Sequence, residues 1–177
     1  MCEPNLTIRR LDKALHDRGA FSSGIEPMDR WLRESATEQI KLNRLRVWCA
    51  TSEEGAFVGY YALAMHSVLP DEAPALARKR ERHAIPAIYL TALAVSEEHQ
   101  GKGIGSALLG DAIARCVALS EEIGTSAIIL DVLKDAHYER RHSFYLSLGF
   151  AEIGNGDAAR LFLSIKDALA ELSAALN

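Results

Sequence analysis

The segment that most constrains the fold is an apolar run followed by glycines and then by an amphipathic pattern. Residues 87–95 (AIYLTALAV) are almost all apolar, which is typical of a strand buried on both faces. Residues 101–105 contain three glycines, and residues 103–123 repeat apolar side chains with a helical period. A second apolar run follows at residues 126–132 (SAIILDV). This strand–helix–strand order predicts two parallel strands joined by a right-handed crossover.

The rest of the chain adds antiparallel strands and further helices. Residues 46–51 and 57–68 predict a hairpin, because a turn-forming Glu-Glu-Gly lies between two β-rich runs. Shorter strands are expected at 6–9 and 160–165, and helices over 25–42, in a segment ending at Leu148, and over 167–176. Residues 71–85 have a charged, helix-like pattern. The sequence therefore predicts an α/β (α+β) fold with a mixed, mostly antiparallel central sheet flanked by helices, in a single domain over residues 1–177.

Composition excludes several classes of protein. With 49% hydrophobic residues and a net charge of −4, the chain resembles an ordinary globular protein, with no overall field that draws nucleic acid or anionic lipid. No apolar run is long enough to span a membrane, and the N-terminus has no signal-peptide pattern. Three widely spaced cysteines favour reduced thiols and a cytoplasmic location. The sequence contains no HExxH or paired-cysteine pattern, so it predicts no metal site.

Glycines at the start of a helix favour close approach of backbone N–H groups to an anion. The chain lacks the GxxxxGK[ST] string of a P-loop. A dinucleotide fingerprint needs GxGxxG, and here the third glycine comes one position early. A plain glycine turn before an amphipathic helix is the structural alternative.

Two motifs, in order, resemble the GNAT superfamily of N-acetyltransferases. Gln100-Gly-Lys-Gly-Ile-Gly105 fits the signature [QR]xxGx[GA], and residues 144–150 (FYLSLGF) fit the later FYxxxGF pattern. The resemblance implies a GNAT-like sheet with a splayed parallel pair, acetyl-CoA as co-substrate and no metal. It also implies that the pantetheine arm lies along Leu93, Ala94 and Val95, that Tyr145 supplies a proton, and that the pyrophosphate is held by Gln100, Gly101, Lys102, Gly103, Ile104, Gly105 and Ser106.

The chemistry of acetyl transfer is compatible with a tyrosine proton donor. A thiol with a pKa near 8.5 and a tyrosine with a pKa near 10 differ by about 2 kcal/mol in proton affinity, so a strengthening hydrogen bond is more favourable than full transfer. The sequence does not single out a general base. The candidates are His66, His83, His99, His137, His142, Glu97 and Glu98.

Three longer segments, 21–34, 57–68 and 85–109, are similar to the acetyltransferase toxins of bacterial toxin–antitoxin pairs. That resemblance implies acetylation of the α-amino group of aminoacyl-tRNA, a homodimer, and a small ribbon-helix-helix antitoxin as partner. An α-amine titrates near 7.7–8.0, so a strong base is unnecessary at neutral pH. Candidate tRNA-binding residues are Arg44, Arg46, Arg78, Lys79 and Arg80. An acetyltransferase of a small-molecule amine and a catalytically idle acetyl-CoA-binding module are the alternatives.

The sequence also departs from the pattern that it resembles. The family tends to place Asn and Ala seven and four residues before the tyrosine, whereas this chain has Tyr138 and Arg141. The segment 131–143 is also longer than usual.

Overall fold

The computed structural model describes residues 5–175, which fall into two compact units. The first unit contains residues 5–64 and 90–112, and the second contains residues 65–89 and 113–175. The long strands β3 (Phe57–Val68) and β4 (Ile85–Val95) contribute residues to both units. Seven strands are hydrogen bonded in the order β1-β2-β3-β4-β5-β7-β6. This mixed, mostly antiparallel sheet with flanking helices confirms the predicted fold class.

In the first unit, the predicted hairpin is present. Strand β2 (Arg46–Thr51) pairs antiparallel with β3, and β1 (Thr7–Arg10) pairs antiparallel with the other edge of β2. The N–H of Gly55 donates to the carbonyl of Ser52 at 2.9 Å and closes the turn between β2 and β3. The strand boundaries of β3 agree with those predicted from the sequence.

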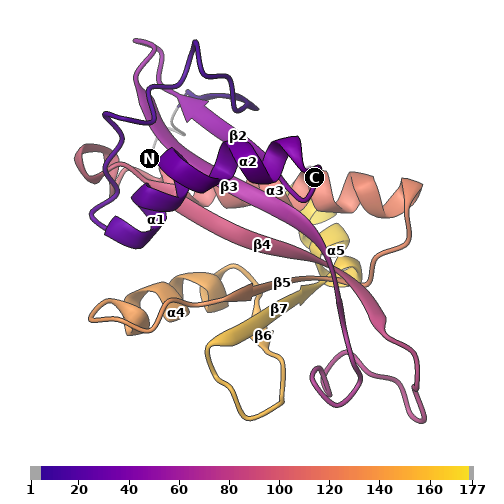
Figure 1. Cartoon of the computed structure of the whole chain (residues 1–177). Helices are drawn as coiled ribbons and strands as arrows, with labels where there is room; N and C mark the ends of the chain where they lie inside the picture. Colours follow the sequence, from indigo (N-terminus) through magenta and orange to yellow (C-terminus); the bar gives the residue numbers. More distant parts are fainter. Residues whose placement is uncertain (1–4, 176–177) are drawn as a thin grey trace. The chain divides into compact units, whose positions relative to one another are not determined.

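The helix predicted over 25–42 is present but is interrupted by a π-helical turn. It consists of α1 (Glu26–Arg30), the π turn Trp31–Ser35 and α2 (Ala36–Lys41). These helices lie across β2 and β3 (Figure 1). They bury one stripe of side chains against the strands, so the core of this unit includes Phe21, Leu32, Ala36, Val47, Cys49, Tyr60 and Ala62.

Helix α3 (Ile104–Glu122) packs closely on the strands because β3 carries a glycine at the contact. A Cβ on Gly59 would lie 2.8 Å from Cδ1 of Leu108 and 2.9 Å from the carbonyl oxygen of Ala94. Both distances are too short for a real side chain, so only glycine allows this approach. Gly59 therefore sets how near the first turns of α3 lie to the end of β4.

The second unit contains the parallel pair that the sequence predicts. Strand β4 pairs parallel with β5 (Ala127–Asp131) from Ala87 to Tyr89. Strand β7 (Arg160–Ser164) runs antiparallel to β5, and the two-residue strand β6 (Ala151–Glu152) runs antiparallel to β7. Helices α4 (Tyr138–Ser147) and α5 (Ile165–Ala175) complete the unit. Its core includes Val68, Ala73, Ile85, Ala87, Ile129 and Ile153.

The expectation of helix-like structure over residues 71–85 is wrong. Instead, turns lead from β3 to β4 and extend away from the strands that they join (Figure 1). Ala73 is fully buried, and the N–H of Ala75 donates to the carbonyl of Ile153 at 3.2 Å instead of to a helical partner. Arg80 has a left-handed φ of 68°, which ends any right-handed helix. Tertiary contacts therefore override the local helical preference.

Candidate active site

The glycine segment joins the end of β4 to the start of α3 within the first unit. A single 3-10 turn, Glu97–His99, follows β4, and its entry is fixed because the N–H of Ser96 donates to the carbonyl of Val58 at 2.9 Å. Gly101 and Gly103 then adopt φ values of 75° and 80°. L-residues with side chains rarely adopt this left-handed conformation, so the loop depends on glycine at these two positions.

Gln100 ties this loop to its surroundings. Its side-chain nitrogen donates to the carbonyl of Ser23 at 2.9 Å and to the carbonyl of Val95 at 3.1 Å. The sequence predicts Gln100 as a cofactor-binding residue. With its amide N–H groups directed to protein carbonyls, we infer that it positions the loop.

The outer side of the loop has the properties of an anion site. Residues 101–103 are exposed, and a Cβ built on Gly101 would meet no atom within 4 Å. The first N–H groups of α3 have no intrahelical acceptor, and its first turn contains no acidic residue. The exposed Lys102 makes no ion pair with any described residue. This free space beside unsatisfied donors fits a pyrophosphate.

The end of β4 has an alternating pattern of burial. Ala92 and Ala94 are buried, whereas Leu93 and Val95 are only half-buried. The parallel pairing with β5 ends at Tyr89, six residues before the end of β4 at Val95. The backbone of residues 93–95 therefore suits addition of an extended ligand by strand-like hydrogen bonds.

Tyr145 lies near the end of α4 in the second unit. Its ring makes edge contacts with Phe144 and Phe150, at centroid distances of 5.2 and 5.8 Å. Burial raises the pKa of Tyr145 to about 12, and the positive charge of Arg141 opposes this rise. The phenol is therefore protonated throughout the physiological pH range and can donate a hydrogen bond.

A comparison with protein families identifies the fold. Residues 43–152 match the model of the acetyltransferase (GNAT) domain, and this range contains both the glycine loop and the FYxxxGF motif. The chain belongs to the GNAT acetyltransferase family. The GNAT resemblance of the sequence is thus confirmed, and with it the activity of an acyltransferase that uses acetyl-CoA.

One relative and two solved structures illustrate the similarity of this GNAT chain. The "tRNA-acetylating toxin" of Mycobacterium tuberculosis (strain ATCC 25618 / H37Rv) is 39% identical over 162 residues, 92% of this chain and 93% of the relative. The crystal structure of AtaTR bound with AcCoA is 26% identical, with a TM-score of 0.76 over 94% of this chain and 98% of that one. A mutant AtaT toxin bound to the C-terminus of the antitoxin AtaR and acetyl-CoA is 24% identical and has a TM-score of 0.78. The match covers 96% of this chain and 99% of that one.

Most candidate bases of this GNAT chain are either exposed or already hydrogen bonded. His99 Nδ1 lies 2.7 Å from Ser96 Oγ, and His142 Nε2 lies 3.0 Å from the carbonyl oxygen of Ala158. The buried Nε2 of His66 has no hydrogen-bond partner among the described residues. The exposed candidates are His83, Glu97, Glu98 and His137.

The predicted basic residues fall into two separate groups. Arg44 and Arg46 lie in the first unit, just before and at the start of β2. Arg78, Lys79 and Arg80 lie on the turns between β3 and β4 in the second unit, where all three are exposed. Among residues 5–175, no carboxylate forms an ion pair with these three cations. They are therefore available to a polyanion.

A polar network that the sequence did not indicate lies at the ends of β5 and β7. Asp131 accepts two hydrogen bonds from Arg160, both at 2.7 Å, and a third from the hydroxyl of Tyr89 at 2.7 Å. Arg160 and then Tyr89 hold the pKa of Asp131 below its usual value, against the opposing effect of burial. A single aspartate at the end of an apolar run is too weak a signal to predict this network from the sequence.

Neither a metal-binding cluster nor a membrane-spanning helix is present among residues 5–175. Within this range, no group of three or more His, Cys, Asp or Glu residues is arranged to hold a metal ion. No helix among these residues is both long and apolar enough to cross a membrane.

Proposed function

We propose that this chain is an acetyl-CoA-dependent N-acetyltransferase that acetylates the α-amino group of aminoacyl-tRNA and thereby blocks translation. The observation that carries the proposal is the 39% identity, over 92% of the chain, with a protein named as a tRNA-acetylating toxin. Identity at this level over almost the full length makes the same substrate class the first expectation.

The loop and the end of β4 would hold the co-substrate. The N–H groups of residues 101–106 would bind the pyrophosphate, with Lys102 adding charge, and the backbone of Leu93, Ala94 and Val95 would bind the pantetheine arm. Acetyl-CoA, when bound, supplies the acetyl group as a thioester. Ile104 is only 4% exposed, so its side chain anchors the loop and only its backbone is available to a ligand.

Tyr145 would hold the proton that the departing sulfur needs. In the reaction the amine nitrogen bonds to the acetyl carbon, the carbon–sulfur bond breaks, the nitrogen loses a proton and the sulfur gains one. With a pKa of about 12 for Tyr145, full transfer to a thiolate of pKa near 8.5 is unfavourable by about 5 kcal/mol. Tyr145 would therefore stabilise the developing thiolate through a hydrogen bond. If Tyr145 does transfer its proton to the sulfur, solvent returns a proton to the phenol.

The acceptor amine would lose its proton without a strong base. An α-amine titrates near 7.7–8.0, so a substantial fraction is neutral at pH 7 and above. Arg44, Arg46 and the exposed group Arg78, Lys79 and Arg80 would contact tRNA phosphates. Such a toxin acts in the cytoplasm, and we further propose a homodimer neutralised by a small ribbon-helix-helix antitoxin.

A cell-free translation reaction tests this function. We expect the wild-type chain to stop synthesis only when acetyl-CoA is present, and the Tyr145→Phe variant to leave synthesis largely intact. If translation continues while the same protein acetylates a polyamine or a free amino acid, the acceptor is a small molecule and the toxin function is wrong. If neither reaction occurs, the toxin function is likewise wrong.

A further inference from the structure

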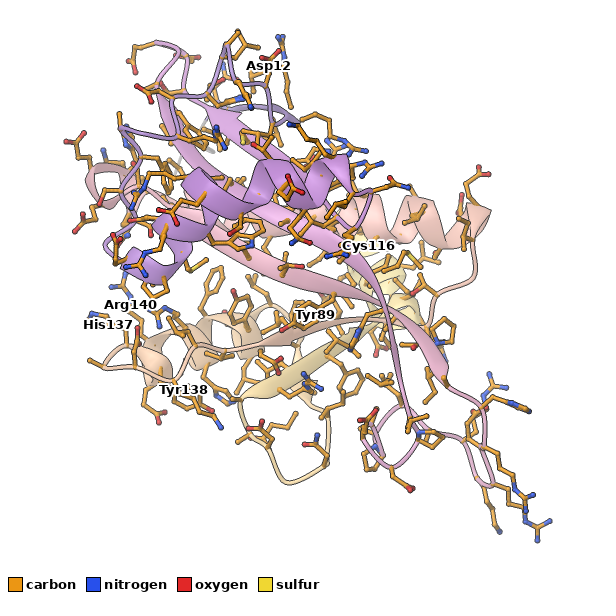
Figure 2. The ribbon with its side chains drawn as sticks, viewed as in Figure 1. Asp12, Tyr89, Cys116, His137, Tyr138 and Arg140 are labelled. Carbon is orange, nitrogen blue, oxygen red and sulfur yellow. The ribbon has the colours of Figure 1, made fainter. Side chains whose placement is uncertain are left out.

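An open pocket of about 500 Å³ lies in the second unit, at the start of α4. One wall comes from the segment between β5 and α4, with Lys134, Asp135 and Tyr138. The other wall comes from residues 156–159, in the loop that joins β6 to β7. Figure 2 shows Tyr138 with His137 and Arg140 at one end of α4. None of the residues predicted to bind acetyl-CoA or tRNA lines this pocket.

The two walls are held together at their base. Asp131 lies just before the first wall, and Arg160 lies just after the second. The two hydrogen bonds that Arg160 donates to Asp131 therefore join the two walls. The N–H of Val132 donates to the carbonyl of Ala159 at 2.8 Å, and His142 Nε2 contacts the carbonyl of Ala158 at 3.0 Å. The pocket is therefore formed before any ligand binds, which reduces the entropic cost of binding.

The lining of the pocket suits a planar heterocycle that carries both donors and acceptors. The ring of Tyr138 is half-buried and lies 5.3 Å from the ring of His142, at an interplanar angle of 32°. On the other side, the exposed Lys134 ammonium and Asp157 carboxylate are 3.0 Å apart. An aromatic ring on which a base can stack, beside a cation, is the arrangement that single-stranded nucleic-acid-binding grooves use. A volume of about 500 Å³ is in the range of small-molecule sites.

The position of Tyr138 on α4 links the pocket to the proposed reaction. Tyr138 and Tyr145 are seven residues apart, so they lie on the same face of the helix, about 10 Å apart along its axis. The path from the α-amine of an esterified amino acid through the ribose to the far edge of the base crosses many covalent bonds of about 1.3–1.5 Å each, so it can span a comparable distance. A base stacked on Tyr138 would thus allow the amine to reach Tyr145.

We propose that this pocket binds a nucleoside, with its base stacked on Tyr138. This inference rests on the proposed function, because both substrates of that reaction end in an adenosine: the 3′ end of tRNA and the nucleotide end of CoA. The spacing to Tyr145 favours the adenosine of the acceptor, which carries the reacting amine.

The test compares two acceptors that differ only in the nucleoside. Aminoacyl-adenosine and the methyl ester of the same amino acid are acetylated by the wild type, by Tyr138→Ala and by Tyr138→Phe, with Leu146→Ala as a control. Leu146 lies on the same helix, is 42% exposed and is outside the pocket lining. Calorimetry of the same proteins with acetyl-CoA and with acetyl-pantetheine shows whether the base belongs to the co-substrate.

For an acceptor nucleoside, Tyr138→Ala should lower kcat/KM for aminoacyl-adenosine roughly ten-fold to a hundred-fold, as for the loss of one stacked base. The methyl-ester rate should stay within about two-fold, and it also reports that the variant is folded. Tyr138→Phe keeps the ring and should resemble the wild type. For a CoA nucleoside, Tyr138→Ala should instead weaken acetyl-CoA binding and leave acetyl-pantetheine binding unchanged. Lys134→Ala, at an exposed position, is a second variant that should weaken binding of the same ligand.

Equal behaviour of the wild type and Tyr138→Ala in all four measurements would overturn the inference and leave the proposed function intact. Failure of the wild type to acetylate either ester, with activity toward other amines, would instead overturn the proposed function, and the inference with it.

Discussion

Asp131, the last residue of β5, accepts two 2.7 Å hydrogen bonds from Arg160, the first residue of β7, its antiparallel partner. The pair fastens the ends of two neighbouring strands at the point where the walls of the nucleoside pocket begin. The side chains are 36% and 28% exposed, so solvent weakens the attraction that the geometry alone would give.

We expect Asp131→Asn to lower the free energy of unfolding by about 1 kcal/mol at pH 7, as for a well-aligned, partly exposed ion pair. The pKa of Asp131 is lowered in the folded chain, mainly by Arg160. Its contribution is therefore full above the unfolded value of about 3.9 and is lost as the pH falls through the lower folded value. Urea unfolding at pH 7 and pH 3 measures the difference, which should shrink at pH 3. Asp71→Asn, an exposed site without an ion pair among the described residues, is the control.

A carboxylate at the start of α3 should prevent acetyl-CoA binding. Gly105 is the second residue of α3, and we expect Gly105→Glu to abolish binding because the new charge would occupy the pyrophosphate site. Gly110→Glu adds the same charge five residues later on the same helix, at an exposed position where a Cβ meets no atom within 4 Å. Isothermal calorimetry should find normal affinity for Gly110→Glu. Equal affinity of both variants would contradict the assignment of the loop.

Removing the hydroxyl of Tyr145 should affect the chemical step but not the binding of acetyl-CoA. We expect Tyr145→Phe to lower kcat by roughly 10²–10⁴, the range for a positioned acid, with acetyl-CoA affinity unchanged. The pKa of about 12 also predicts the pH profile, because the donor keeps its proton until the solution is strongly alkaline. Wild-type kcat should rise as the acceptor amine loses its proton and should show no descending limb below about pH 10. A variant with wild-type turnover would reduce Tyr145 to a packing residue.

The salt dependence of the reaction should report the cations between β3 and β4. Each phosphate that a cation neutralises contributes roughly 0.7–0.9 to the slope of log affinity against log salt. We expect Arg78→Glu with Lys79→Glu to raise KM for aminoacyl-tRNA and to reduce this slope by about 2. Lys13→Glu with Lys166→Glu changes the net charge equally at exposed sites outside both basic groups. Steady-state kinetics at several salt concentrations distinguish a local contact from a general effect of charge.

Local patterns in the sequence predicted most of the fold. The apolar run of β4, the glycines and the period of α3 each depend on neighbours in the sequence, so their order and the parallel crossover could be predicted. The turns over 71–85 could not, because their conformation depends on burial of Ala73 and on a hydrogen bond to Ile153, about 80 residues away. The two residues of β6 are too short to produce a periodic signal.

The candidate site shows the same difference between local motifs, which could be predicted, and contacts between distant residues, which could not. Gly101 and Gly103 could be identified because they belong to a short motif, and both adopt positive φ values. Their binding to a pyrophosphate stays a prediction. The contacts of Asp131 depend on the register in which β5 pairs with β7, which a single sequence does not contain. The inferred role of Gln100 in positioning the loop depends on its hydrogen bond to the carbonyl of Ser23, a residue from a distant part of the chain.

The most direct test of the central claim is transfer of radiolabelled acetyl groups from acetyl-CoA to purified tRNA. Charged and uncharged forms of the same tRNA are incubated with the wild-type chain, and the label is followed into the RNA and, after mild alkaline deacylation, into the released amino acid. Our account predicts label on charged tRNA only, all of it released as N-acetyl amino acid. Label that remains on the RNA after deacylation, or an unlabelled charged tRNA alongside rapid acetylation of polyamines, would contradict it.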